Sequence, residues 1–159
     1  METKHNLSIL VKNNSGLLLR VSGLFSRRGY NIQSISAAQT QDPDITRMTI
    51  TVGGDQQTLE QIENQVRKLV DVIEVKVIDN TNAVLREHMI MKVTASDETR
   101  AAVVEIANLF KANIVDVGAD NMMLELTGEP KKISGFINLI EPYGIIELMR
   151  TGVCGLERG

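Results

Sequence analysis

The sequence predicts an α+β protein built from two consecutive βαββαβ units. Between residues 7 and 77, strand-like alternation and helix-spaced apolar residues succeed one another in the order strand, helix, strand, strand, helix, strand. The same order returns between residues 89 and 149. The polar, turn-rich stretch 79–87 between them has the composition of a linker. This order is that of the ferredoxin-like fold, so we expect one such domain over residues 1–79 and another over residues 80–159.

The first unit starts with a strand and a helix joined by a tight turn. Apolar side chains occupy alternate positions of residues 7–11, which is typical of a strand with one buried face. The turn "NNSG", residues 13–16, follows. We expect Asn14 or Ser15 to cap the next helix and Gly29 to end it in a left-handed conformation. The apolar face of this helix consists of Leu17, Leu18, Val21, Leu24 and Phe25.

Three strands and a second helix complete the first unit. Residues 32–37 predict a strand, which the stretch "TQDPD" ends. Residues 48–52 alternate between apolar side chains and threonine and predict a half-buried strand. A helix with one apolar face follows, and residues 73–77 alternate again as a fourth strand. The apolar face of the second helix consists of Leu59, Ile62, Val66 and Leu69.

The second unit repeats this architecture with little of the same sequence. Residues 89–95 alternate as a strand, and we expect Ser96 or Asp97 to cap the helix that follows. Residues 114–117 and 122–126 predict a hairpin. Pro130 suits the first turn of the last helix, and residues 145–149 predict the last strand.

The composition limits the possible partners. The net charge is −3 and the pI is about 5.4, with neither half of the chain strongly basic, so we expect no nucleic acid as a ligand. The single Cys154 fits a reducing cytosol, and we expect a cytoplasmic protein. The N-terminal residues lack the apolar core of a signal peptide, and no apolar run is long enough to span a membrane.

The first turn has the components of a small-anion site. A turn into a helix N-terminus exposes backbone amides, and the helix dipole adds partial positive charge, which suits an α-carboxylate. Gly16 lets a ligand approach the backbone, and Asn13 and Asn14 offer donors and acceptors that can hold an ammonium group. Leu17 and Leu18 can line a small apolar pocket. Together these residues favour a free amino acid with a branched aliphatic side chain.

A simpler interpretation stays open, in which Asn, Ser and Gly only form a capped turn. The corresponding turn of the second unit, residues 95–98, carries two acids and no glycine, so it would repel a carboxylate. Only the first unit therefore has the composition expected of a carboxylate site.

Two stretches of the chain, one of which begins at this turn, resemble a known family. The stretch "NNSGLLLRVSGLFSRRGYNIQSISAAQTQDPDITRMTI" is similar to the small regulatory subunit of acetolactate (acetohydroxyacid) synthase, and "LFSRRGYNI" with "TRMTI" is its most telling part. The ending "RTGVCGLERG" also resembles that family's C-terminus. The N-terminal half resembles an ACT domain, the amino-acid-sensing ferredoxin-like module.

The resemblance implies a regulatory role without catalytic chemistry. The chain would activate a large catalytic subunit that uses thiamine diphosphate, with Mg and FAD also expected only there and no cofactor in this chain. It would form a homodimer and convey feedback inhibition by valine in branched-chain amino acid biosynthesis. The implied effector site takes Asn13, Asn14, Ser15, Gly16, Leu17 and Leu18 from one chain, with Asn31 and Ile32 from its partner.

Other functions fit these residues less well. A stand-alone ACT-type regulator of another protein is the remaining alternative, whereas a DNA-binding regulator would need a helix-turn-helix, for which no segment is left. An RNA-binding sheet needs exposed aromatic residues, and aromatics make up only 3% of the chain. The two histidines, His5 and His88, and Cys154 are too scattered for a metal motif, and Ser15 has no evident base, so we expect no catalytic residue and no metal ligand.

Overall fold

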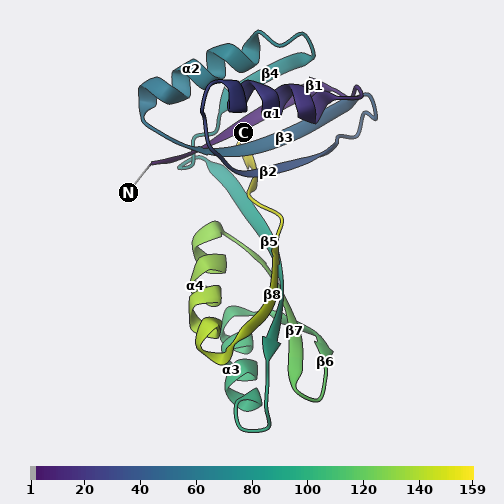
Figure 1. Ribbon diagram of the computed structural model, residues 1–159, viewed down its shortest axis with the longest axis vertical. Coiled ribbons are helices and arrows are strands. Elements are labelled where there is room, and N and C mark those ends of the chain that lie inside the picture. The colour runs from purple at the N-terminus through teal and green to yellow at the C-terminus, as the bar shows by residue number, and fades with distance from the viewer. Residues whose placement is uncertain (1–2) are drawn as a thin grey trace. The chain divides into compact units, whose positions relative to one another are not determined.

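The computed structural model describes residues 3–159, which form two compact units. The first unit comprises the chain up to Val84 together with Gly152–Gly159, and the second comprises Leu85–Thr151. Each unit combines an antiparallel sheet with two helices, which confirms the predicted α+β class and the repeated βαββαβ order (Figure 1). The predicted second domain, residues 80–159, included the C-terminal residues. In the structure the segment Gly152–Gly159 belongs to the first unit instead.

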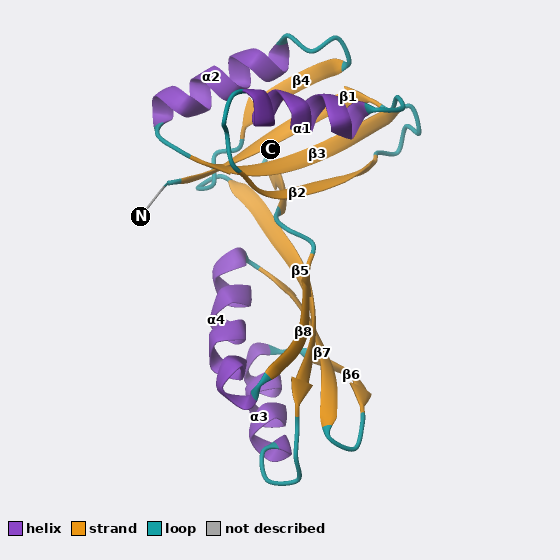
Figure 2. Ribbon diagram, viewed as in Figure 1, coloured by secondary structure: helices purple, strands orange, loops and turns teal. Residues whose placement is uncertain are grey.

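The first unit is a four-stranded sheet covered on one face by two helices (Figure 2). Its strand order is β2-β3-β1-β4, so β2 and β4 are the edge strands. Ile9 lies opposite both Met48 and Val75, and all three side chains point to the helix-covered face. The elements are β1 (Lys4–Lys12), α1 (Leu17–Arg27), β2 (Ile32–Gln39), β3 (Ile45–Gly53), α2 (Gln56–Arg67) and β4 (Val72–Val77).

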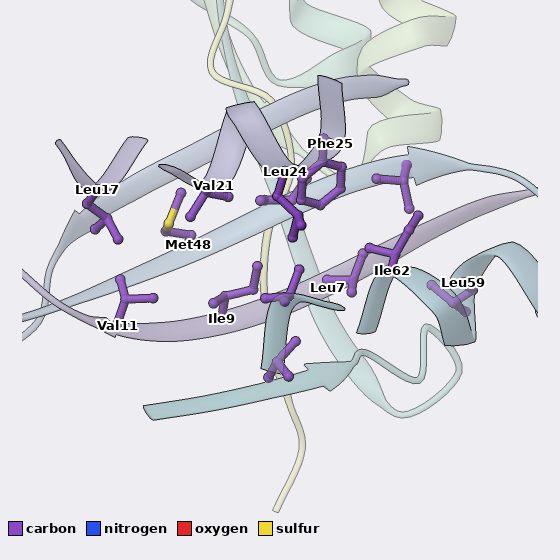
Figure 3. Close-up of a cluster of buried hydrophobic side chains, with 14 residues drawn as sticks. Leu7, Ile9, Val11, Leu17, Val21, Leu24, Phe25, Met48, Leu59 and Ile62 are labelled. Atoms are coloured by element: carbon purple, nitrogen blue, oxygen red, sulfur yellow. The ribbon is translucent and has the colours of Figure 1, made fainter. Parts of the chain in front are cut away.

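An aliphatic core lies between the helices and the sheet of the first unit (Figure 3). Phe25 is the largest side chain in it and is 1% exposed. Leu18, which the periodicity assigned to the buried helix face, is instead 55% exposed, because it lies on the side of α1 turned away from the sheet. The core residues are Leu7, Ile9, Val11, Leu17, Val21, Leu24, Phe25, Met48, Ile50, Val52, Leu59, Ile62, Val66 and Val75.

Helix α1 ends at Gly29, as predicted. Gly29 has φ +71°, and its N–H donates to the Ser26 carbonyl at 3.1 Å, while the N–H of Tyr30 donates to the Phe25 carbonyl at 3.0 Å. This is the Schellman arrangement, and it is accompanied by an edge-to-face contact between the rings of Phe25 and Tyr30. Glycine is suited to this position because it adopts positive φ without strain from a Cβ.

The second unit repeats this plan with the strand order β6-β7-β5-β8. Its core is again aliphatic and methionine-rich, with Phe136 its largest fully buried side chain. The predicted hairpin is confirmed by the pairing of β6 with β7, and Pro130 opens α4 as predicted. The elements are β5 (Ala83–Thr94), α3 (Arg100–Phe110), β6 (Asn113–Val117), β7 (Asn121–Gly128), α4 (Pro130–Ile140), the 3₁₀ turn η1 (Glu141–Tyr143) and β8 (Ile145–Arg150).

Two local predictions for this region are wrong. The expected linker 79–87 is strand from Ala83 onward, because β5 extends well before its apolar part. Neither Ser96 nor Asp97 caps α3, since the helix begins only at Arg100. The Ser96 side chain instead pairs with the Thr99 hydroxyl at 3.1 Å, which stabilises a separate turn before the helix.

A last strand, β9 (Cys154–Glu157), was not predicted. The segment Gly152–Gly159 that contains it contacts the face of the first sheet opposite the helices: Gly152 lies against Ser34 of β2, β9 contacts β3, and Glu157 pairs with Lys76 of β4. This face carries a hydrogen-bonded row of polar side chains, of which Thr51 and Asn6 are buried: Ser34 Oγ donates to Thr51 Oγ1 at 3.0 Å, and Thr51 Oγ1 to Asn6 Oδ1 at 2.8 Å. No helix of the described residues is long and apolar enough to cross a membrane.

Candidate functional site

The loop between β1 and α1 is hydrogen-bonded to the connection between β2 and β3. The N–H of Asn13 donates to the Asp44 carbonyl at 2.8 Å, and its side-chain Nδ2 donates to the Pro43 carbonyl at 3.0 Å. Gly16 closes the loop with φ +77°. This left-handed conformation explains why a glycine stands at that position.

Helix α1 starts without a side-chain cap. We expected Asn14 or Ser15 to cap it, and this prediction is wrong: the N-cap position is Gly16, and no side chain caps the helix. The physical reason is that glycine has no side chain to serve as a cap, while Asn14 Nδ2 is oriented by donation to the distant Asp71 carboxylate at 2.8 Å. The N–H of Leu17 donates to the Asn14 carbonyl at 3.3 Å, but among residues 3–159 the N–H groups of Gly16, Leu18 and Leu19 find no acceptor.

A hollow of about 370 Å³ opens beside this uncapped helix start. Its size is within the ordinary range for small-ligand sites. The loop and α1 form one wall, and the ends of β2 and β3 that meet at Gln39 and Thr46 form the other. The lining residues are Asn13, Asn14, Gly16, Leu17, Leu18, Leu19, Ala37, Ala38, Gln39 and Thr46.

The chemistry of the hollow is amphipathic. None of the lining residues carries a formal charge. Leucine side chains and the methyl groups of Ala37 and Ala38 supply apolar contact, while the asparagines and the unpaired amides of α1 supply polar contact. The unpaired amides and the helix dipole favour an anionic group at this end of α1. Such a lining suits a small molecule that has one aliphatic and one anionic end.

Five of the eight predicted site residues line this hollow and three do not. Ser15 lies in the same loop, but only its backbone has a described role, as its carbonyl accepts from Arg20 Nη2 at 3.0 Å. Asn31 and Ile32 lie at the other end of β2, where Ile32 pairs with Val52. They are roughly 23 to 26 Å from the Gln39 end, at about 3.3 Å per strand residue. Within one chain they therefore do not share the hollow, and their role stays a prediction that needs a second chain.

Sequence reasoning missed the strand wall of the hollow. Ala37 was expected to lie in a strand, but Ala38, Gln39 and Thr46 were not connected with the site. Their proximity follows from the antiparallel register in which Gln39 faces Thr46. The register brings together residues from two different strands. In a single sequence, only the turn between the two strands indicates which residues will face one another.

The counterpart turn in the second unit is built differently. Arg100, the first residue of α3, directs its Nη2 at the carbonyl oxygens of Ala95 and Gly118, at 3.1 and 3.0 Å. At this turn the Arg100 guanidinium is bound to carbonyl oxygens, whereas the corresponding turn of the first unit has unpaired backbone amides. Asp97 and Glu98 of this turn are both exposed.

The described residues contain no group of three or more His, Cys, Asp or Glu that could hold a metal ion. His5 lies in the first unit, where its Nε2 is 3.2 Å from the Gly54 carbonyl. His88 lies in the second unit beside the Thr127 hydroxyl, with 2.8 Å between Nδ1 and Oγ1. Both imidazoles therefore have local structural contacts.

Two family models match the chain. The model described as the AHAS small subunit-like ACT domain matches residues 7–74, and the model described as the small subunit of acetolactate synthase matches residues 86–159. The two matches together cover most of both structural units.

Full-length relatives agree with the family models. The acetolactate synthase small subunit of Mycolicibacterium smegmatis is 44% identical over 155 residues, covering 98% of this chain and 91% of that protein. The probable acetolactate synthase small subunit of Archaeoglobus fulgidus is 45% identical over 156 residues, covering 98% of each. The crystal structure of the acetolactate synthase small subunit from Thermotoga maritima superposes with a TM-score of 0.91 at 38% identity, covering 99% of this chain and 98% of that one.

Proposed function

The chain belongs to the family of acetolactate synthase small subunits, and from this premise we propose that it activates a thiamine-diphosphate-dependent catalytic subunit and makes it sensitive to inhibition by valine. The chain itself contributes no catalytic residue and no cofactor. Thiamine diphosphate, Mg and FAD belong to the catalytic subunit. The complex works in the cytoplasm, in the synthesis of branched-chain amino acids.

The hollow beside α1 is the proposed valine site. The α-carboxylate accepts hydrogen bonds from the unpaired N–H groups of Gly16, Leu18 and Leu19. The ammonium group is held by the side-chain oxygens of Asn13 and Asn14, since their amide nitrogens already donate elsewhere. The isopropyl group lies against the apolar lining.

A homodimer completes the site. Strand β2 is an edge strand, and its unpaired backbone groups and the partly exposed Ile35 favour pairing with a second copy. A two-fold related chain would bring its Asn31 and Ile32 to the hollow of the first.

The match that carries this proposal is the pairing of an ACT domain with a second unit of the same family. A stand-alone regulator of another protein would need only the first of these. The acetolactate synthase small subunit model over residues 86–159 therefore favours a dedicated catalytic partner.

Reconstitution tests the proposal. The purified chain is mixed with the catalytic subunit, and acetolactate formation from pyruvate is measured with and without valine. We expect no activity from the chain alone, stimulation of the catalytic subunit, and loss of that stimulated activity as valine is added. Calorimetric titration with valine, leucine, isoleucine and an unrelated amino acid then defines the ligand. Binding of valine without any effect on the catalytic subunit would favour the stand-alone regulator.

A further inference from the structure

Asp71 lies outside the hollow but is bonded to its loop at several points. It is in the connection between α2 and β4, and its side chain is only 12% exposed. Oδ1 accepts the hydrogen bond from Asn14 Nδ2 at 2.8 Å, and Oδ2 pairs with Arg20 Nη1 at 3.1 Å. Its carbonyl also accepts from the N–H of Lys12 at 2.9 Å.

Arg20 closes a ring of contacts around the loop. The same guanidinium that pairs with Asp71 donates through Nη2 to the Ser15 carbonyl at 3.0 Å. The ring thus runs from Asp71 to Asn14, along the chain to Ser15, and through Arg20 back to Asp71. It encloses the residues that directly precede Gly16.

This ring fixes the features that the hollow needs. Because its nitrogen donates to Asp71, the Asn14 amide group is oriented, and its oxygen does not cap α1, so the first N–H groups of the helix stay unpaired. The Ser15 carbonyl is drawn toward Arg20, which helps to hold Gly16 at positive φ. A charged carboxylate accepting two such contacts is a strong anchor, because charge-assisted hydrogen bonds are the stronger ones.

We propose that Asp71 is a positioning residue for the effector site: it orders the Asn14–Gly16 loop before ligand arrives and so raises the affinity for the effector. This inference rests on the proposed function, because it takes the hollow as the site of an amino acid. Asp71 acts through Asn14 and Arg20 without touching the ligand. The affinity gain comes from loop order that the ligand does not have to impose.

The main test compares Asp71→Asn with a matched control in the same unit. Glu63→Gln also removes one carboxylate charge, and Glu63 pairs with Arg67 at 2.6 Å on α2, away from the loop. Full-length chains are titrated with valine by calorimetry at a temperature where circular dichroism shows each variant folded. We expect valine to bind Asp71→Asn about tenfold more weakly than wild type, the scale set by one hydrogen bond to a charged group. Glu63→Gln should bind valine like the wild type.

A double-mutant cycle separates positioning from general destabilisation. Asn14→Ala, Asp71→Ala and the double variant are titrated in the same way. If Asp71 acts in part through Asn14, the loss of valine affinity in the double variant is smaller than the sum of the two single losses, because both single changes remove the same Asn14–Asp71 hydrogen bond. Additive losses of affinity, or a lower melting temperature with unchanged valine affinity, would overturn the proposal. Should the wild-type chain bind no amino acid, it is the proposed function that fails, and this result is distinct from either of those.

Discussion

Glu157 near the C-terminus accepts a hydrogen bond from Lys76 Nζ at 3.0 Å, so the end of the chain is tied to the edge strand β4 of the first unit. The other carboxylate oxygen accepts from the backbone N–H of Asp79 at 3.1 Å. The neighbouring N–H of Arg158 donates to the Asn82 carbonyl at 2.8 Å. The C-terminal segment is therefore an integral part of the first unit, although the whole second unit, Leu85–Thr151, separates it in sequence from the rest of that unit.

These contacts predict a pH dependence. The hydrogen bond from the Asp79 N–H, and after it that from Lys76, lowers the pKa of the Glu157 carboxyl below its ordinary value of 4.5. A group whose pKa is lowered on folding stabilises the fold above its unfolded pKa, and this contribution is lost as the pH falls through the folded pKa. Glu157→Gln should therefore melt at a lower temperature than wild type at neutral pH, and the difference should vanish at a pH well below 4.5.

Melting curves across this pH range check the prediction. Glu105→Gln makes the same change of charge at an exposed position of α3 and should follow the wild type throughout. If the melting temperature of Glu157→Gln stays equally far below that of the wild type in acid, the ion pair and hydrogen bonds of the Glu157 carboxylate are not the cause of the difference.

Gly152 predicts a packing constraint at the start of the same segment. It has φ +78°, and a Cβ added there would lie 2.8 Å from the Cβ of Ser34. Gly29 shares the positive φ, at +71°, but has open space around its Cβ position. Gly29→Ala should cost about 1–2 kcal/mol from backbone strain alone. Gly152→Ala should cost roughly 1–3 kcal/mol more, because an overpacked contact is added.

Urea unfolding of the two variants measures the difference, and a compensating change isolates its cause. Ser34→Gly removes the atom that the new Cβ would meet. The double variant Gly152→Ala with Ser34→Gly should therefore be more stable than the sum of the two single effects predicts. If the changes in the free energy of unfolding are strictly additive, the contact with Ser34 is not the reason why Gly152→Ala is destabilised.

The elements of this fold were predictable from sequence where local signals decide them. The order of strands and helices followed from apolar periodicity, and the end of α1 followed from Gly29. The uncapped start of α1 was not predictable, because it depends on Gly16 taking the N-cap position and on the orientation of Asn14 by Asp71, a contact of long sequence separation. Strand β9 was missed because it is only four residues long, Cys154–Glu157, and includes a glycine.

The candidate site was predictable to the extent that it is continuous in sequence. The composition of the turn Asn13–Gly16 predicts a helix N-terminus with free backbone amides, which suits an anionic ligand. The opposite wall depends on which residues of β2 and β3 face one another, and the pairing of Gln39 with Thr46 is a property of the folded sheet.

Gly16 predicts that valine control can be separated from activation. In Gly16→Asp the new carboxylate would lie near the proposed position of the ligand's carboxylate, and two like charges about 4 Å apart repel by roughly 4 kcal/mol at an effective dielectric near 20. This corresponds to about a thousandfold loss of affinity. We expect the Gly16→Asp chain to stimulate acetolactate formation while valine no longer inhibits it at the wild-type concentration.

Gly16→Ala is the control for backbone strain. Gly16 has φ +77° and nothing within 4 Å of its Cβ position, so alanine adds strain without a clash and without a charge. Asp tolerates the left-handed region at least as well as Ala does. Inhibition by valine should therefore be weakened far less in Gly16→Ala than in Gly16→Asp. Equal loss in both variants would assign the effect to the backbone and not to repulsion of a carboxylate.

The shared site predicts complementation between two defective chains. Gly16→Asp damages the loop contributed by one chain, and Asn31→Ala damages the residue contributed by its partner, so each pure variant should bind valine poorly. In a hybrid dimer one site carries both changes and the other carries neither. Random mixing makes about half of the dimers hybrids, so about a quarter of all sites should regain wild-type affinity. Calorimetry after mixing, unfolding and refolding the two variants together measures this fraction. If each site is contained within a single chain, the mixture binds no more valine than the two variants do separately.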